Sequence, residues 1–270
     1  MLYKQNQSYE LDEKLFKNPT SEYRAAPFWA WNCKLNKDIL NEQIDIFKKM
    51  GFGGFHMHSR IGMSTPYLKD EFMGLIKFCT QKAEQENMLA YLYDEDRWPS
   101  GSAGGYVTKT HKYRQRYLIF SQNSREHFSL DEAINSSKDY LLAVFDVVLN
   151  EKGELKSYHT ISENDTAIGT KWYAYVHTHD ESPWHNNQTY VDTLNKEAID
   201  EFIKITYEAY QSAVGDEFDK IIPSIFTDEP QCKPKIPLSF ADSTDDAQLP
   251  WSFSLPKGFS DKYGYDICGY

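Results

Sequence analysis

Short apolar segments alternate with amphipathic helical segments through the first hundred residues, and this alternation most limits how the chain can fold. Strands are predicted over 26–31, 53–58 and 88–93, and helical spacing over 36–50 and 68–83 separates them. Strands that are joined through helices form parallel βαβ units rather than hairpins. The sequence therefore predicts an α/β fold with a parallel sheet.

The alternation breaks between residues 116 and 181. Runs at 117–120, 140–149 and 172–177 are typical of antiparallel strands with hairpin connections. A helix returns at Asn195, with Ile199, Phe202, Ile203 and Tyr210 expected on one face. A fourth strand is predicted over 221–226, and the last forty residues are expected to be loop-like.

Four β-α units are half of a (β/α)₈ barrel, a fold that typically needs roughly 250 residues. We expect an α/β fold of the TIM-barrel type, limited to its first four β-α units and carrying an inserted antiparallel β subdomain. The expected segments are 1–115 for the first units, 116–181 for the insertion, and 182–270 for the third helix, the fourth strand and the following loop. An open sheet is the alternative to such a truncated barrel.

The net charge limits the possible partners. Lys and Arg number 29 against 40 Asp and Glu, a formal charge of −11, which opposes binding to a phosphate backbone. We expect no nucleic acid and no membrane, since no window reaches the roughly 18 apolar residues of a membrane span. Without a recognisable signal peptide or a disulfide pattern in the 4 cysteines, the expected location is cytoplasmic.

Carboxylates follow two of the predicted strands. Asp94, Glu95 and Asp96 come after the third strand, and Asp228 and Glu229 after the fourth. Acidic residues often serve there only as turn formers. Because the carboxyl ends of parallel strands meet at one edge, two such clusters favour a catalytic site, and paired carboxylates are what glycoside hydrolysis requires. We therefore predict Glu229, Asp228 and Glu95 as catalytic residues, with Asp94 and Asp96 binding a carbohydrate substrate.

His56 and His58 are two residues apart on a strand, so both face the same side. A metal-dependent hydrolase could use such a pair, but the sequence offers no further histidine at the fourth strand. We predict no metal site, and expect one histidine to line the substrate pocket and the other to have a structural role. The metal-dependent hydrolase stays an alternative.

Five other residues near strand ends are candidate sugar ligands. Arg60 and Arg97 follow strand ends and could pair with the carboxylates. Trp29 and Trp98 could stack on a sugar ring, and Asn32 could bind a hydroxyl. Each also has an ordinary explanation as a loop, core or turn residue. The aromatic content of 15% is consistent with sugar binding.

Several strand-end motifs resemble bacterial proteins of glycoside hydrolase family 106, over residues 22 to 266. The motifs are PFWAWN at 27–32, HMHSR at 56–60, TPYL at 65–68, YDEDRWPSG at 93–101, AGG at 103–105, YVDTLN at 190–195, IFTDEP at 225–230 and FSDKYGYD at 259–266. The resemblance implies α-L-rhamnosidase activity on a (β/α)₈ catalytic barrel. Glu229 would stand in the place of the general acid.

The same resemblance implies inversion of configuration, with a second carboxylate on a later strand. It also implies a calcium ion near the sugar, for which this sequence offers no matching ligands. A non-catalytic, truncated half-barrel that binds sugar is therefore the alternative to a working glycosidase.

Overall fold

The structure is a computed structural model that describes residues 9–240 and 242–269. The chain divides into two compact units, each built from two stretches of sequence. Unit 1 takes the residues up to Gly104 and Phe202–Pro230, and unit 2 takes Gly105–Glu201 and the residues from Gln231 onward. Unit 2 thus starts before residue 116 and includes residues beyond 230, so its extent differs from the predicted insertion.

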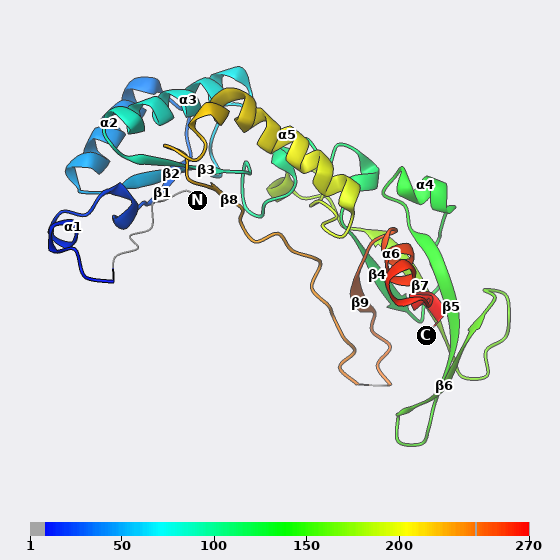
Figure 1. Cartoon of the computed structure of the whole chain (residues 1–270). Helices are drawn as coiled ribbons and strands as arrows, with labels where there is room; N and C mark the ends of the chain where they lie inside the picture. Colours follow the sequence, from blue (N-terminus) through cyan, green and yellow to red (C-terminus); the bar gives the residue numbers. More distant parts are fainter. Residues whose placement is uncertain (1–8, 241, 270) are drawn as a thin grey trace. The chain divides into compact units, whose positions relative to one another are not determined.

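Unit 1 contains a parallel sheet of four strands in the order β1-β2-β3-β8 (Figure 1). The strands are β1 (Phe28–Trp31), β2 (Gly54–Ser59), β3 (Leu89–Tyr93) and β8 (Ile225–Phe226). The parallel pairing agrees with the predicted βαβ units, but the fourth strand keeps only the last two of its predicted residues. The described residues form an open sheet and do not close into a barrel.

Helices α2 (Lys37–Lys49) and α3 (Asp70–Gln85) pack side by side on one face of this sheet (Figure 1). The Asn36 side chain caps α2 by accepting two backbone N–H groups. Tightly packed aromatic and aliphatic side chains fill the space between helices and sheet: Trp29, Trp31, Ile44, Phe55, Met57, Phe72, Ile76 and Leu92. This buried layer holds the strands in place and so fixes where their carboxyl ends lie.

Helix α5 (Lys196–Val214) begins at the predicted position, and the division between the units falls within it. Its buried face differs from the predicted one, because Ile203 is 46% exposed. The buried residues of its unit 1 part follow a four-residue spacing: Phe202, Thr206, Tyr210 and Val214.

Unit 2 contains an antiparallel sheet of five strands in the order β6-β5-β7-β4-β9. Its strands are β4 (Arg116–Ser121), β5 (Tyr140–Leu149), β6 (Leu155–Ile161), β7 (Thr170–Thr178) and β9 (Ala247–Trp251). The structure contains the three predicted antiparallel strands, β4, β5 and β7. The sequence analysis missed β6 and β9.

The last forty residues are more ordered than predicted, since they contain β9 and helix α6 (Leu255–Tyr263). Leu255 and Phe253 pack against a core on one face of the sheet, formed by Leu118, Ala174, Val176 and Trp251. The loop-like prediction for this stretch was therefore wrong over these two elements.

The remaining elements are short. Two are α-helices, α1 (Glu13–Lys17) and α4 (Leu130–Ile134), and the others are 3₁₀ turns at Ser21–Tyr23, Ala103–Gly105, His111–Tyr113, Pro183–His185, Gly215–Glu217 and Ile267–Gly269. Among the described residues, no helix combines the length and the apolar character needed to cross a membrane.

Candidate active site

Two acidic segments follow neighbouring strands of unit 1 and leave the sheet at the same edge. Residues 94–96 follow β3, and residues 227–229 follow β8. Tyr93 pairs with Phe226 in parallel register, and the Asp94 amide donates to the Phe226 carbonyl at 3.3 Å. The structure thus places the two predicted carboxylate clusters side by side.

Asp94 is a buried link between three segments of unit 1. Its Oδ1 accepts a hydrogen bond from Ser100 Oγ at 2.5 Å. Its Oδ2 accepts from Tyr207 OH at 2.8 Å and from Thr227 Oγ1 at 2.7 Å. Burial raises the pKa of Asp94, while these three hydroxyl donors lower it. Asp94 therefore ties the loop after β3 to α5 and to the end of β8.

Glu95 is the acceptor around which the loop after β3 folds. It is 1% exposed, and its two oxygens accept five backbone N–H groups at 2.5 to 3.0 Å: those of Asp96, Gly101, Ser102, Ala103 and Gly104. Gly101 has a φ of 137°, a conformation that a residue with a Cβ rarely adopts. Burial raises the pKa of Glu95 to about 7, and the amide donors oppose that rise. The side chain thus faces its own loop and is shielded from solvent.

Asp228 lies just beyond the carboxyl end of β8, next to His58. Its side chain is 17% exposed, and its Oδ2 accepts a hydrogen bond from Tyr93 OH at 3.2 Å and lies 3.9 Å from His58 Nε2. Burial and the nearby Arg60 lower the pKa of His58, although Asp228 raises it, so the imidazole is neutral at neutral pH. Ser100 holds the backbone of Asp228 in place. Its Oγ accepts the Asp228 N–H at 2.8 Å, and its own N–H donates to the Asp228 carbonyl at 2.9 Å.

Glu229 is the exposed carboxylate of the cluster. Its Oε2 accepts a hydrogen bond from Trp98 Nε1 at 3.0 Å, which joins the loop after β3 to the loop after β8. Its φ of 45° lies in the left-handed region that non-glycine residues seldom adopt, and such conformations gather at functional sites. The hydrogen bond from Trp98 therefore holds an accessible carboxyl group next in sequence to the partly exposed Asp228.

Aromatic rings cover the sheet face that α2 and α3 leave open. His58 stacks on Tyr93 at a centroid distance of 3.8 Å, and His56 stacks on Tyr91 at 4.4 Å. Phe28, which is 56% exposed, contacts both histidines. Both predicted histidines thus share one face, and His58 is the one that reaches the strand-end cluster.

Other predicted ligands lie elsewhere in unit 1. Trp29 is 7% exposed on the opposite face of the sheet, where its indole N–H donates to Gln43 at 2.8 Å. Its position in the core follows from strand alternation, which turns Phe28 outward and Trp29 toward the helices. Asn32 and Arg60 are exposed beyond the ends of β1 and β2. Arg60 lies close enough to His58 for its charge to lower the pKa of that imidazole, but among the described residues none of the three forms a hydrogen bond or ion pair with a strand-end carboxylate.

Asp96 and Arg97 form a pair within the loop after β3. The carboxylate and guanidinium lie 3.3 Å apart, with the Asp96 side chain 12% exposed and that of Arg97 25% exposed. The pair is adjacent to the cluster in sequence, but Arg97 neutralises Asp96 rather than Asp94 or Asp228.

Four residues of the cluster were missed at the sequence level: Tyr93, Ser100, Tyr207 and Thr227. Thr227 and Tyr93 flank the predicted carboxylates, so their position at the strand ends was a usable signal. Tyr207 comes from a helix more than a hundred residues away, and no local pattern marks it.

Metal-ligating side chains do not gather in the described part of the chain. No group of three or more His, Cys, Asp or Glu residues there has the arrangement needed to hold an ion. At the strand ends, hydroxyl and amide donors already occupy the oxygens of Asp94 and Glu95. These residues therefore do not fit the calcium ion that the family resemblance implies.

Comparison with known proteins shows a likeness of fold. No protein-family model matches the chain, and no curated protein sequence matches it. The solved structure of a rhamnosidase from Novosphingobium sp. PP1Y is similar, with a TM-score of 0.56 and 12% sequence identity. The match covers 95% of this chain and 42% of that one, so the chain spans less than half the length of the rhamnosidase. The chain therefore has a rhamnosidase-like fold.

Proposed function

We propose that the chain is a glycoside hydrolase of the family 106 type, that it acts on an α-L-rhamnoside, and that Glu229 is its general acid. The observation that carries this proposal is the exposed Glu229 carboxyl, oriented by the Trp98 indole beside buried, hydrogen-bonded carboxylates. The strand-end motifs and the rhamnosidase-like fold support it. On this proposal the parallel sheet is the first half of a (β/α)₈ barrel.

Protonation of the leaving oxygen is the step assigned to Glu229. Cleavage of a glycosidic bond needs a carboxyl group that delivers a proton to the departing alcohol. The hydrogen bond from Trp98 Nε1 holds Oε2 of Glu229 in place. Oε1 is then the atom that transfers the proton.

The sugar ring is assigned to the open face of the sheet. Phe28 presents an exposed ring there, and sugars stack on such surfaces. Asp228, which is partly exposed beside His58, can accept hydrogen bonds from sugar hydroxyls. Asp94 and Glu95 receive positioning roles, because backbone and hydroxyl donors of the protein already engage them.

The test uses two substrates that differ in their leaving group. Glu229→Gln should lower kcat on an alkyl rhamnoside by roughly 10²- to 10⁴-fold, because an alkoxide leaves slowly without a proton. The loss should be much smaller on a nitrophenyl rhamnoside, whose phenolate leaves unprotonated. Trp98→Phe removes the indole donor and should cost roughly tenfold on the alkyl substrate, which corresponds to about 1.4 kcal/mol.

The matched control is Glu42→Gln, which changes an exposed carboxylate of α2 and should leave both rates unchanged. Equal losses on the two substrates would contradict the general-acid role. If Glu229→Gln turned over both substrates at the wild-type rate, the assignment of Glu229 would be wrong.

Sugar binding without hydrolysis is the second candidate function. It is favoured because hydrogen bonds within the protein already engage Asp94 and Glu95. Of the four carboxylates at positions 94, 95, 228 and 229, Asp228 and Glu229 are then the ones that reach solvent. This function would be supported over hydrolysis if calorimetry showed that the chain binds rhamnose, Asp228→Ala abolished that binding, and neither rhamnoside were turned over. Neither binding nor turnover would contradict both.

A further inference from the structure

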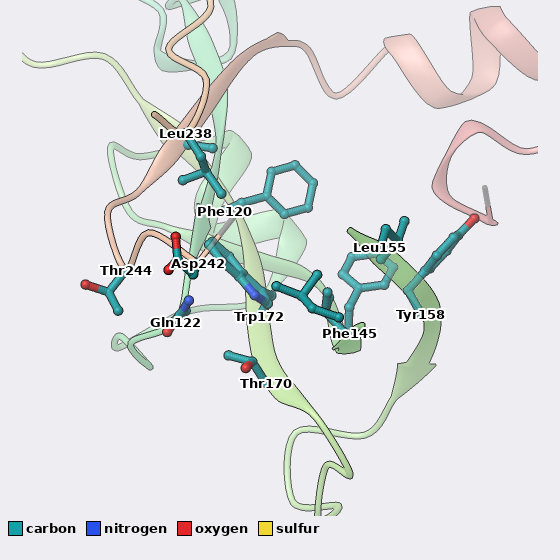
Figure 2. A pocket seen from close by; sticks show the side chains of 13 residues that line it. Phe120, Gln122, Phe145, Leu155, Tyr158, Thr170, Trp172, Leu238, Asp242 and Thr244 are labelled. Carbon is teal, nitrogen blue, oxygen red and sulfur yellow. The ribbon is translucent and has the colours of Figure 1, made fainter. Parts of the chain in front are cut away.

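Unit 2 has a cavity of about 630 Å³ on one face of its five-stranded sheet (Figure 2). The residues that line it are Phe120, Gln122, Phe145, Val147, Leu149, Leu155, Tyr158, Thr170, Trp172, Leu238, Asp242, Thr244 and Ala247. All of them belong to unit 2. The volume lies in the range of pockets that hold small molecules.

The floor of the pocket follows from strand alternation on neighbouring strands. Phe145 of β5 pairs with Trp172 of β7, and Val147 pairs with both Tyr158 of β6 and Thr170. Paired residues project to the same side of a sheet, so these side chains form one continuous surface. Rings and aliphatic chains therefore dominate the floor, with Trp172 near its centre (Figure 2).

The same sheet face is covered at another place. Leu255 of α6 packs with Leu118, Ala174 and Val176, so this part of the face is closed by the chain itself. Around the pocket the face stays accessible, since Leu155 is 60% exposed and Tyr158 is 40% exposed. Accessible apolar surface of this kind is costly in water and marks binding sites.

The two ends of the pocket differ in polarity. Figure 2 shows Gln122, Asp242 and Thr244 gathered at one end, and Phe145, Leu155 and Tyr158 at the other. The sheet order gives the same result, because β6 and β5 lie at one side, whereas β4 and β9 lie at the other.

The polar end is a built structure rather than a loose loop. Gln122 Nε2 donates to the Ser243 carbonyl at 3.3 Å. Ile236 and Gln248 exchange backbone hydrogen bonds at 2.8 and 2.9 Å, and Arg125 pairs with Asp246. Backbone bonds at Ile236, and contacts at Ser243, Asp246 and Gln248, thus hold the described residues on either side of the polar end in place.

We propose that this pocket binds a small, uncharged amphiphile with a flat apolar body and one hydrogen-bond donor. The body fits over Trp172 and Phe145, and the donor reaches the oxygens of Asp242, Gln122 or Thr244. None of the described lining residues is Lys, Arg or His, and Asp242 repels anions. This binding site does not depend on the proposed glycosidase function.

The experiment uses two fluorescent probes that differ only by one sulfonate. N-phenylnaphthylamine is uncharged and has one N–H donor, and anilinonaphthalene sulfonate is its anionic counterpart. We expect the 270-residue chain to bind the uncharged probe saturably at one site per chain, at least about tenfold more tightly than the sulfonate. Equal affinity for both, or no saturable binding of the uncharged probe, would overturn the proposal.

Two matched variants locate the binding site. Leu155→Asp places a charge at the apolar end and should weaken binding of the uncharged probe about tenfold or more. Ile168→Asp makes the same type of change at a residue of unit 2 that is 91% exposed and outside the lining set, and it should leave binding unchanged. Thermal unfolding checks that both variants fold.

Binding that Leu155→Asp leaves intact would overturn the proposed location. Sedimentation separates a further outcome. If the wild-type chain is a dimer, Leu155→Asp dissociates it and neither form binds the uncharged probe, then a second copy of the chain covers this face. The small-molecule proposal would then be wrong.

Discussion

The carboxylate cluster of unit 1 and the pocket of unit 2 use their sheets in opposite ways. In unit 1, charged and hydroxyl groups are buried at one edge of a parallel sheet, where Asp94 and Glu95 have hydrogen-bond donors on both oxygens. In unit 2, mostly apolar side chains line an accessible face, and Gln122, Asp242 and Thr244 gather at one end of the pocket. A parallel sheet sends segments that are distant in sequence to one edge, whereas an antiparallel sheet offers a broad face.

This contrast has an energetic consequence. A buried polar cluster depends on a few donors and acceptors, and removing one leaves its partner unsatisfied at a cost of about 1–3 kcal/mol. The following predictions test how far such buried polar groups stabilise each unit, in order of expected size.

Replacing Glu95 should have the largest effect on stability. Glu95→Gln exchanges one carboxylate oxygen for an NH₂ group, so at least two of the five backbone N–H donors lose their acceptor. We expect a loss of about 4 kcal/mol in the free energy of unfolding, measured by urea denaturation. Hydrogen exchange should accelerate over residues 96–104, while probe binding in unit 2 stays unchanged. A loss below about 1 kcal/mol, comparable to an exposed site, would contradict the anchoring role.

Asp192 offers the matching test in unit 2. It is 3% exposed, and its side chain accepts hydrogen bonds from Ser252 Oγ at 2.6 Å and from the Leu194 N–H at 3.1 Å. Burial raises its pKa from 3.8 to about 6, although these two hydrogen bonds and the nearby Arg116 lower it. A raised carboxyl pKa favours folding below pH 3.8, and that contribution is lost as the pH rises through about 6. Relative to the wild type, the free energy of unfolding of Asp192→Asn should therefore increase by up to roughly 3 kcal/mol as the pH rises from 4 to 7. A constant difference across that range of urea titrations would contradict this titration.

Ser100 should have the smallest of the three effects. Ser100→Ala removes the donor to Asp94 Oδ1 and the acceptor of the Asp228 amide, both at a buried position. We expect a loss of about 2 kcal/mol in stability. Ser162→Ala, at an exposed turn of unit 2, is the control and should change stability by less than about 0.5 kcal/mol. Equal losses in the two variants would show that the hydroxyl of Ser100 does not hold the two loops together.

The sequence predicted the parallel part of the fold because its signals are local and repeated. Each of β1 to β3 is a short apolar run, and α2 and α3 carry clear apolar stripes. The missed strands lack such signals. β9 contains Pro250, which argues against a central strand, and it lies at the edge of its sheet, where proline is tolerated. β6 is mostly exposed and polar, so it shows no alternation.

The candidate site was predictable only in outline. Acidic residues at the ends of parallel strands indicate an edge where carboxylates meet, and Asp94 and Asp228 do lie together there. The pattern cannot separate a carboxylate that faces solvent, such as Glu229, from one that binds its own loop, such as Glu95. That distinction depends on where the backbone N–H groups of residues 96–104 point, which the sequence does not state.

The hydrogen bonds of Asp94 also bear on the order in which the nascent chain matures. Its partner Thr227 is synthesised 133 residues later, and the inserted stretch of unit 2 is made in between. At about 5–20 residues per second, the ribosome needs roughly 7–27 seconds to supply that partner. During this interval Asp94 lacks two of its three hydroxyl donors, Tyr207 and Thr227, while the Glu95 loop has all of its donors within nine residues. The loop after β3 can therefore form early, and the candidate active site is completed only when β8 leaves the ribosome.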